Sequence, residues 1–431
     1  MTDVYIVQKL EKVISKKDIN VEVPGSKSIT NRALMLAALS DGECNLDGVL
    51  FSDDSRAFLD CLEKLGFQLF IDENEKRVKV VGTSGEIPNR KATIDVRSAG
   101  TAARFLTVML AVTGGEYTLN SSEQMKKRPM GEIIDLLRNA GVKISCLEEE
   151  GHFPFIISSN GLDKKEVSIN TDTSSQYASA LLMAAVMTGL KIKLTGKRVN
   201  GAYIKITLNM LKQFGIKYVQ FEENKYNIEK QRFRLEKYQI EPDMSGACYF
   251  YAMSLMIKKK VLVKNLHLNS MQGDIKFLYA LKKMGCLVKD TDEGIIIDGS
   301  NVSEYKGIEI DMNDFSDQAL TMACVAAFAK SKTLIKNVGH IKMQECDRVN
   351  AIITNLNCLG IKAREELADG KVNICIEPGK VNSGEIETFN DHRVAMSFTL
   401  IGLVCGGITI KNPMCCKKTF ENYFDIIDSL Y

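Results

Sequence analysis

The sequence predicts an α/β fold of two similar lobes, each built from three units of βαβαββ type. The first observation is a motif of polar cap, apolar helix, tight turn and strand that recurs along the whole chain. The second is an amphipathic helix that follows in each unit and ends at a glycine. The third is the length of 431 residues, which is long for one domain and favours two.

The apolar helices open the six units. The first follows a Pro-Gly turn in "VPGSKSITNRALMLAALSDG", residues 23–42. Five related segments begin at Ala99, Asp172, Asp243, Asp314 and Asn390. Because these helices are apolar on every side, we expect each of them to lie inside its lobe.

The amphipathic helices follow, as in "RVNAIITNLNCLG", where Val349, Ile352 and Leu356 belong to one apolar stripe. Five of them end at Gly66, Gly141, Gly215, Gly285 and Gly360, which are 70 to 75 residues apart. These glycines stand where a left-handed C-cap is expected. "FENYFDIIDSL" begins a truncated sixth copy. We expect the one-sided helices to lie under the sheets.

The starts of the apolar helices indicate an anion site. Three buried helices in each lobe would point their N-termini the same way, and each N-terminus carries free N–H groups and about half a positive charge. Lys27, Ser28 and Arg32 stand where such a site would receive a phosphate or carboxylate. The alternatives are that Ser28 is an ordinary N-cap beside solvated cations, or that the chain is a repeat scaffold. Scaffold repeats are usually about 20 to 50 residues, shorter than those seen here.

Composition excludes several classes of protein. Lysine plus arginine (56) nearly balance aspartate plus glutamate (54), so no basic field indicates a nucleic-acid partner. Twelve cysteines without a C-x-x-C pair, and a start without a cleavable apolar stretch, are typical of a reduced cytoplasmic protein. No apolar run approaches the roughly 18 residues of a membrane span. The four histidines lack ligand spacing and no nucleotide-binding glycine motif is present, so we expect no metal, ATP or NAD.

Charged side chains beside turns and helix starts are the candidate binding groups. They are Lys27, Arg32, Arg128, Arg348, Arg393 and Lys418. A guanidinium binds a carboxylate or phosphate bidentately, whereas a lysine acts as a mobile point charge. "TSSQ", residues 173–176, adds hydroxyls and an amide suited to a phosphate. Each cation taken singly would more often be a solvated surface charge, and their recurrence is what favours a site.

Two carboxylates are the candidates for proton transfer. Asp317 in "DFSDQAL" and Glu345 in "QECDR" each lie next to predicted cationic positions. A base in such company could take a hydroxyl proton while the cations hold an anionic substrate. Asp347 and Asp391 are weaker candidates, expected to cap helices or orient the neighbouring arginines.

Eight segments together carry a resemblance to a known family. They are "PGSKSITNRAL", "SAGTAARFL", "MKKRPMGEIIDLL", "SSQYASALLMAA", "NSMQGDIKF", "ECDR", "NDHRVAM" and "KTF". In this order they resemble the 5-enolpyruvylshikimate-3-phosphate synthase family over essentially the whole chain. The resemblance implies two inside-out α/β lobes, residues 1–23 plus 242–431 and residues 24–241, that close around the substrates.

The resemblance also implies the reaction. The 5-hydroxyl of shikimate 3-phosphate adds to C2 of phosphoenolpyruvate, C3 gains a proton, and phosphate is then eliminated. The catalytic residues would be Asp317, Glu345 and Lys27. Shikimate 3-phosphate would be bound by Lys27, Ser28, Arg32, Ser174, Ser175, Gln176, Asn200, Asp317, His340 and Gln344. Phosphoenolpyruvate would be bound by Lys27, Gly100, Arg128, Gln176, Arg348, Arg393 and Lys418. We expect a monomer that needs no cofactor.

Three positions depart from the family pattern. Gln344 replaces a usual lysine, Asn200 replaces a serine that touches the shikimate phosphate, and Phe105 replaces a proline. Lys342 could substitute for the missing lysine. Two alternatives stay open. A sister transferase acting on UDP-N-acetylglucosamine would need a cysteine near residue 120, where "SSEQMKKRP" has none, and an inactive binding homologue is favoured only by Gln344.

Overall fold

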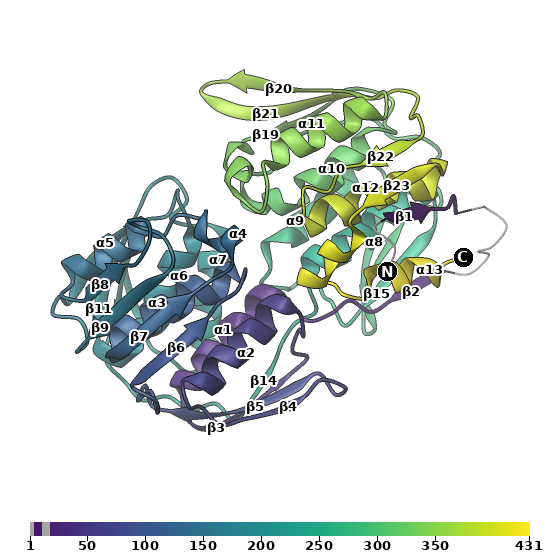
Figure 1. The fold of residues 1–431 in the computed structure, drawn as a ribbon. Coiled ribbons are helices and arrows are strands. Elements are labelled where there is room, and N and C mark those ends of the chain that lie inside the picture. Colours follow the sequence, from purple (N-terminus) through teal and green to yellow (C-terminus); the bar gives the residue numbers. More distant parts are fainter. Residues whose placement is uncertain (1–3, 11–17) are drawn as a thin grey trace. The chain divides into compact units, whose positions relative to one another are not determined.

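The structure is a computed structural model that describes residues 4–10 and 18–431 (Figure 1). The chain divides into two compact units. The discontinuous unit comprises Met1–Pro24 and Pro242–Tyr431, and the continuous unit comprises Gly25–Glu241. Both are mixed α/β structures made of small sheets and helices, so the predicted fold class is confirmed.

The continuous unit contains three four-stranded sheets that share one pattern. In each, the first strand is parallel to the second, and the next two follow antiparallel. The first sheet has the order β14 (Lys237–Gln239), β3 (Asp41–Asp47), β5 (Arg77–Thr83) and β4 (Leu69–Asp72). The second has β6 (Lys91–Asp95), β7 (Gly115–Asn120), β9 (Phe155–Ser159) and β8 (Lys143–Cys146). The third has β10 (Glu166–Asn170), β11 (Leu190–Thr195), β13 (Lys225–Ile228) and β12 (Val219–Glu222).

The discontinuous unit repeats this pattern, and two of its sheets each include a strand from the start of the chain. Its first four-stranded sheet has the order β16 (Leu287–Thr291), β17 (Gly294–Asp298), β15 (Lys260–Lys264) and β2 (Ile19–Val21). Its second has the order β18 (Glu309–Asp311), β19 (Thr333–Lys336), β21 (Lys371–Glu377) and β20 (Lys362–Ala368). The third has three strands, β1 (Val4–Val7), β23 (Ile408–Lys411) and β22 (Gly384–Ile386). β1 pairs antiparallel with β23, so the two chain ends share a sheet.

Two strands are exchanged where the chain passes between the units. In a regular repeat, as in β6–α3–β7, the strand before the helix pairs in parallel with the strand after it. Helix α1 (Lys27–Leu39) instead joins β2 to β3, but β3 pairs with β14. Helix α8 (Met244–Ile257) joins β14 to β15, but β15 pairs with β2. Each unit therefore completes a sheet with a strand from a distant part of the sequence.

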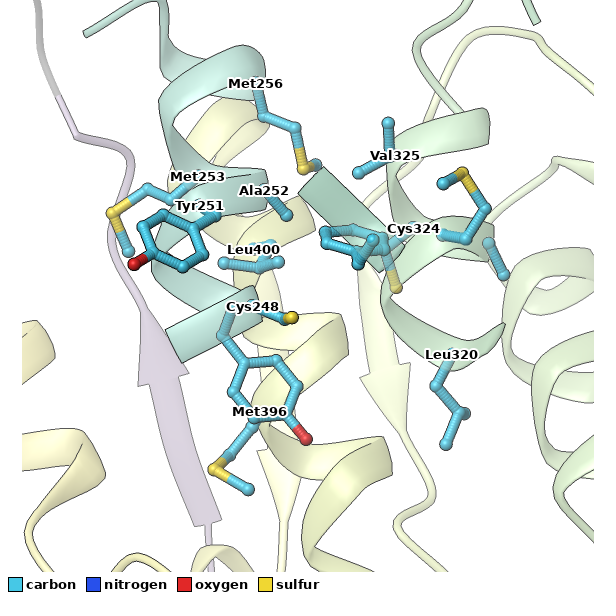
Figure 2. Packing of buried hydrophobic residues seen from close by; sticks show 14 of the residues in the cluster. Cys248, Tyr251, Ala252, Met253, Met256, Leu320, Cys324, Val325, Met396 and Leu400 are labelled. Atoms are coloured by element: carbon cyan, nitrogen blue, oxygen red, sulfur yellow. The ribbon is translucent and has the colours of Figure 1, made fainter. Parts of the chain in front are cut away.

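The apolar helices form the core of each unit, as predicted. They are α1, α3 (Gly100–Thr113) and α6 (Ser175–Thr188) in the continuous unit, and α8, α10 (Ala319–Ala326) and α12 (His392–Cys405) in the other. The three helices of each unit contact one another. Figure 2 shows the second core, where Cys248, Cys324 and Leu400 come from three different helices.

Two of the predicted helix starts differ in the structure. The helix expected from Asp314 begins as the 3-10 helix η2 (Asn313–Gln318), and α10 starts only at Ala319. The cause is the non-helical backbone of Phe315, with φ −141° and ψ 42°. The helix expected from Asp172 is capped at Ser174, whose Oγ accepts a hydrogen bond from the Gln176 amide.

The amphipathic helices end as predicted. They are α2 (Asp53–Lys64), α5 (Gly131–Asn139), α7 (Ala202–Gln213), α9 (Lys276–Lys283), α11 (Arg348–Cys358) and α13 (Tyr423–Asp428). The five glycines that follow the first five have φ between 75° and 106°, which confirms the left-handed C-caps. The short helices are α4 (Glu123–Lys126), η1 (Gly273–Ile275), η3 (Gly339–Met343) and η4 (Pro413–Lys418). Within residues 4–10 and 18–431, none of the helices combines the length and the apolar character that spanning a bilayer requires.

Candidate active site

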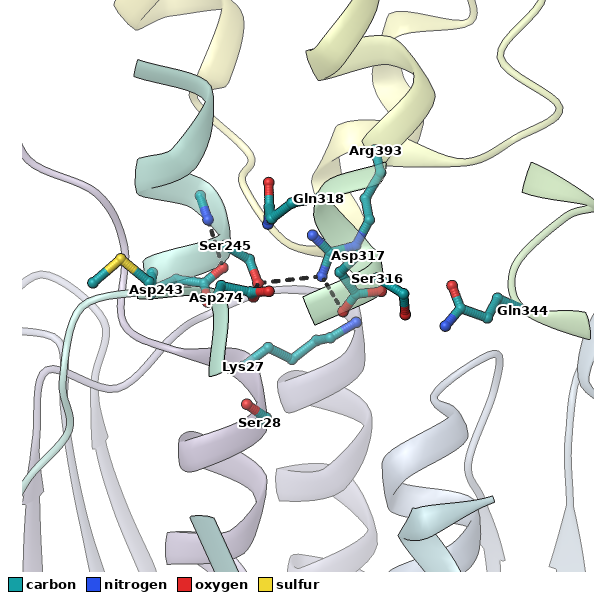
Figure 3. A network of polar contacts seen from close by, with 12 residues as sticks. Lys27, Ser28, Asp243, Ser245, Asp274, Ser316, Asp317, Gln318, Gln344 and Arg393 are labelled. Atoms are coloured by element: carbon teal, nitrogen blue, oxygen red, sulfur yellow. Dashed lines mark hydrogen bonds and ion pairs between the residues drawn. The ribbon is translucent and has the colours of Figure 1, made fainter. Parts of the chain in front are cut away.

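Asp317, Arg348 and Arg393 of the discontinuous unit converge on one cluster. The Asp317 carboxylate accepts from Arg348 Nη1 at 2.9 Å. It also accepts from Arg393 Nη2 at 3.0 Å (Figure 3). Asp317 lies in η2, Arg348 is the first residue of α11, and Arg393 is the second residue of α12. The three side chains are nearly buried, with exposed fractions of 13%, 3% and 11%. Since both carboxylate oxygens are held by cations, this group is fixed in position.

Asp391 holds Arg348 from the other side. Arg348 Nε donates to Asp391 Oδ2 at 2.7 Å and Nη2 donates to Oδ1 at 3.3 Å. Asp391 also caps α12, because its side chain accepts from the Arg393 amide at 2.9 Å. Burial lowers the pKa of Arg348, but the carboxylates of Asp391 and Asp317 more than offset this, so its pKa lies above its ordinary value. Arg348 therefore stays a cation. The predicted capping role of Asp391 is confirmed, whereas its hold on Arg348, 43 residues away, was not predicted.

Glu345 and Lys418 form a second pair. Lys418 Nζ lies 2.5 Å from Glu345 Oε2, and both side chains are nearly buried. Glu345 precedes α11 and Lys418 ends η4, so the pair joins two segments that are far apart in the sequence. The predicted proton-transfer group and a predicted anion-binding cation are thus direct partners.

Gln344 contacts Arg348 through its amide oxygen, which accepts from Arg348 Nη1. Lys342 pairs with Glu365 at 2.7 Å, so here it does not take the place of the missing lysine. His340 Nε2 lies 2.6 Å from the Ser316 hydroxyl, next to Asp317 in the chain. Gln344, which stands where the family usually has a lysine, is therefore part of the cluster formed by Asp317, Arg348 and Arg393.

In the continuous unit, Lys27 is the first residue of α1. Its Nζ lies 3.3 Å from Asp54 Oδ2, and Asp54 belongs to the first turn of α2. The Ser28 hydroxyl lies 3.3 Å from that of Ser26. Ser26 is the N-cap of α1, and its side chain makes no cap hydrogen bond. Ser28 is thus not the N-cap that the alternative interpretation of the sequence assumed.

Arg32 is buried among neutral groups. Its Nε donates to Thr207 Oγ1 at 2.8 Å, Nη2 to Ser179 Oγ at 3.0 Å, and Nη1 to the Ser28 carbonyl at 2.8 Å. The guanidinium also lies over the Phe105 ring, 5.3 Å from its centroid. Among the residues that the structure describes, no carboxylate pairs with it, and burial lowers its pKa to about 10. A buried cation without an anionic partner is suited to an anionic ligand.

Two arginines lie against Gly100, the first residue of α3. A Cβ placed on Gly100 would lie 2.7 Å from Arg104 Nη1 and 2.7 Å from Arg128 Nη1. Arg104 Nη1 also donates to the Gly100 carbonyl at 2.9 Å. The absence of a side chain at residue 100 thus lets two guanidinium groups approach the start of a helix, where anions are favoured.

The remaining predicted residues of this unit lie at the start of α6 and before α7. Ser174 is the N-cap of α6, and Ser175 and Gln176 form its first turn. The Gln176 Oε1 atom is buried without a hydrogen-bond partner. The side-chain amide of Asn200, which was expected to contact the substrate phosphate, donates to Glu223 Oε1.

Sequence reasoning did not find four side chains of these clusters. Asp54 pairs with Lys27, Arg104 lies against Gly100, and Ser245 and Asp274 contact each other next to Arg393. The only signal for Arg104 is its position one turn after Gly100, and "QGD" contains Asp274 without indicating that it is buried. Among the described residues, no group of three or more His, Cys, Asp or Glu side chains is arranged to hold a metal ion.

Comparison with known proteins shows which family this chain resembles. Residues 13–427 match the family model of EPSP synthase (3-phosphoshikimate 1-carboxyvinyltransferase). A 3-phosphoshikimate 1-carboxyvinyltransferase from Nostoc punctiforme is 40% identical over 410 residues, covering 94% of this chain and 95% of that protein. One from Vibrio atlanticus is 37% identical, covering 97% and 98%. A solved EPSP synthase structure from Acinetobacter baumannii has the same fold, with a TM-score of 0.80 at 23% identity over 99% of this chain and 97% of that one. The chain belongs to the EPSP synthase (3-phosphoshikimate 1-carboxyvinyltransferase) family.

Proposed function

We propose that this chain transfers the enolpyruvyl group of phosphoenolpyruvate to the 5-hydroxyl of shikimate 3-phosphate, which serves aromatic amino acid biosynthesis. The products are 5-enolpyruvylshikimate 3-phosphate and phosphate. The observation that most supports this proposal is the Asp317 carboxylate held between Arg348 and Arg393. One cluster thereby offers a base for a hydroxyl and two guanidinium groups for a phosphorylated acid.

Asp317 is proposed as the base of the addition step. It accepts the proton of the 5-hydroxyl while the hydroxyl oxygen forms a bond to C2 of phosphoenolpyruvate. The arginines neutralise the negative charge of the carboxylate and phosphate groups, which reduces the repulsion between the two anionic substrates. His340 and Gln344 are proposed to contact shikimate 3-phosphate.

Glu345 and Lys27 are the proposed groups for proton transfer at C3. C3 gains a proton as the C2–O bond forms and loses one when phosphate leaves, which restores the double bond. The 2.5 Å contact with Lys418 keeps Glu345 next to a cation proposed to bind phosphoenolpyruvate. A carboxyl group that gives up and regains one proton satisfies both steps.

The continuous unit is proposed to supply the remaining contacts. Ser28, Arg32 and Asn200 serve shikimate 3-phosphate, with Ser174, Ser175 and Gln176 around its phosphate. Gly100 and Arg128 serve phosphoenolpyruvate, and Gln176 and Lys27 serve both substrates. The neutral surroundings of Arg32 support its proposed contact with shikimate 3-phosphate, because a substrate carboxylate would supply the missing counter-charge.

Phosphate release tests the reaction. The protein is incubated with phosphoenolpyruvate and shikimate 3-phosphate, and in parallel with phosphoenolpyruvate and UDP-N-acetylglucosamine. We expect release only with shikimate 3-phosphate, and a loss of about 10² to 10⁴ in kcat for Asp317→Asn. Asp314→Asn is the matched control, because Asp314 lies in the same 3-10 helix but is 44% exposed and pairs with Lys276. Release only with the nucleotide sugar would overturn the proposed substrate.

The cell compartment and assembly state are also proposed. All twelve cysteines are free and several are buried, which supports a reducing, cytoplasmic location. We propose that the chain acts as a monomer. Light scattering on a size-exclusion column would contradict this if the measured mass exceeded the 47.9 kDa of one chain.

A further inference from the structure

The Asp274 carboxyl lies in the arginine cluster but has no part in the proposed reaction. Asp274 belongs to η1, which packs against η2, the helix that carries Asp317. The residue is buried, with an exposed fraction of 9%. A buried carboxyl group next to a binding site needs an explanation, because burial disfavours its charge.

A chain of contacts joins Asp274 to Asp317. The Ser245 hydroxyl donates to Asp274 Oδ2, and Arg393 Nη2 donates to Ser245 Oγ at 3.5 Å and to Asp317 Oδ2 at 3.0 Å. Figure 3 shows Arg393 reaching both Ser245 and Asp317. The Arg393 guanidinium thus meets Asp317 directly and Asp274 through one hydroxyl.

The charges of this cluster do not balance. The guanidinium groups of Arg348 and Arg393 pair with the carboxylates of Asp317 and Asp391, and Asp274 adds a third carboxyl group, which Arg393 reaches through the Ser245 hydroxyl. A bound phosphorylated acid would add further negative charge to the same guanidinium groups. In a buried cluster this repulsion is weakly screened, and proton uptake by a carboxylate relieves it.

The pKa of the Asp274 carboxyl lies above its ordinary value. Burial raises the pKa of Asp274 to about 6, and the charges of Asp317 and Asp243 raise it as well, while Arg393 and the Ser245 hydrogen bond oppose the rise. Lys276, the residue that follows η1, pairs with Asp314 at 2.5 Å, and these two side chains are 46% and 44% exposed. The 3.5 Å contact from Arg393 Nη2 to Ser245 Oγ is long for a hydrogen bond. We therefore expect Asp274 to act on Arg393 through its charge more than through this hydrogen-bonded contact.

We propose that Asp274 is a positioning residue that balances Arg393 in the empty site and takes up one proton from solvent when phosphoenolpyruvate binds. The carboxylate becomes a neutral acid, and Arg393 is left to balance Asp317 and the bound anion. This inference rests on the proposed function, because that function supplies the anion.

The test is the pH dependence of kcat/KM for phosphoenolpyruvate at saturating shikimate 3-phosphate, across roughly pH 5.5 to 8.5. In the unaltered chain we expect kcat/KM to decline as pH rises through the ionisation of Asp274, because the ionised group repels the incoming anion. A coupling of one pKa unit corresponds to a tenfold decline. Asp274→Asn should abolish the decline. The ionisation of phosphoenolpyruvate itself is common to all variants and cancels in their ratios.

Ser245→Ala gives a second, independent result. Its hydroxyl lowers the pKa of Asp274, so removing it should move the decline to higher pH without abolishing it. Asp314→Asn should follow the unaltered chain. A profile for Asp274→Asn that superimposes on the unaltered one, or a shift to lower pH in Ser245→Ala, would overturn the inference. If Asp274→Asn does not fold, Ser245→Ala decides. Absence of phosphate release by the unaltered chain would overturn the proposed function instead.

Discussion

Arg348 and Asp391 form an ion pair in which both side chains are withdrawn from solvent, with exposed fractions of 3% and 0%. Two hydrogen bonds join them, from Arg348 Nε at 2.7 Å and from Nη2 at 3.3 Å. Asp391 therefore neutralises a buried guanidinium that the proposed reaction needs, and also begins the helix that carries Arg393.

Removing Asp391 should destabilise the protein. In Asp391→Ala the Arg348 charge stays buried without its main partner, and α12 loses its N-cap, so we expect the free energy of unfolding to fall by about 3 to 5 kcal/mol. Urea unfolding measures this. The matched control is Glu304→Ala, because Glu304 and Lys330 pair at 58% to 63% exposure and their loss should cost no more than about 0.5 kcal/mol. Equal losses in the two variants would contradict the role given to Asp391.

A side chain at residue 100 should weaken phosphoenolpyruvate binding. The methyl group in Gly100→Ala would approach Arg104 Nη1 and Arg128 Nη1 to 2.7 Å, so at least one guanidinium must shift. We expect KM for phosphoenolpyruvate to rise about ten- to a hundredfold, with a smaller change for shikimate 3-phosphate. Gly131→Ala is the control, because Gly131 also begins a helix and its Cβ would lie an ordinary 3.7 Å from the Gly151 Cα. Unchanged kinetics in Gly100→Ala would show that the arginines do not depend on this glycine.

Restoring the lysine that the family usually has should not improve this enzyme. The Gln344 amide oxygen accepts from Arg348, and Gln344→Lys would replace that acceptor with a second cation beside the guanidinium. We expect kcat/KM for phosphoenolpyruvate to fall by a factor equivalent to about 1 to 2 kcal/mol. Lys342→Gln should leave it unchanged, because Lys342 pairs with Glu365. A gain of activity in Gln344→Lys would mean that the side chain works on substrate rather than on Arg348.

Replacing Arg32 should leave the stability of the protein unchanged or higher but weaken the binding of shikimate 3-phosphate. Because its guanidinium is buried among hydroxyls and aromatic rings, Arg32→Met removes an uncompensated charge, and we expect the Tm of the free protein to stay level or rise. The increase in Tm caused by shikimate 3-phosphate should be lost. Thermal unfolding with and without this ligand measures both effects. Arg234→Met, at a side chain 63% exposed, should change neither. Full stabilisation by the ligand in Arg32→Met would exclude Arg32 from the binding site.

The buried Asp274 should make stability depend on pH. Its pKa of about 6 in the folded protein exceeds the ordinary value of 3.8, so the folded state binds more protons between these values and loses stability as pH rises through them. Asp274→Asn lacks this loss. Its Tm relative to the unaltered chain should therefore increase from about pH 4 to pH 7, by the equivalent of at most about 3 kcal/mol. A flat difference, like that expected for Asp314→Asn, would contradict the burial of an ionising group.

Local and periodic features were readable from the sequence. The apolar helices are buried because each is hydrophobic around its whole circumference, and the glycines from Gly66 to Gly360 adopt positive φ because a helix C-cap favours a residue without a Cβ. The sequence placed Asp317, Arg348 and Arg393 beside the starts of helices, but their contact with one another depends on the packing of α10, α11 and α12.

Other features depended on partners far away in the chain. The resemblance implied that residues 1–23 and 242–431 form one lobe. The pairing of β14 with β3 and of β2 with β15 could not be read from the local sequence, because a strand of three residues does not encode which sheet edge it will join. The 3-10 turn that carries Asp317 follows from the backbone of a single residue, Phe315, in a segment whose composition favours a helix. Asp274 belongs to the same group. The sequence shows a carboxyl group after "QG", but its burial beside Ser245 and Arg393 depends on the packing of η1 against η2. That burial is what raises the pKa of Asp274.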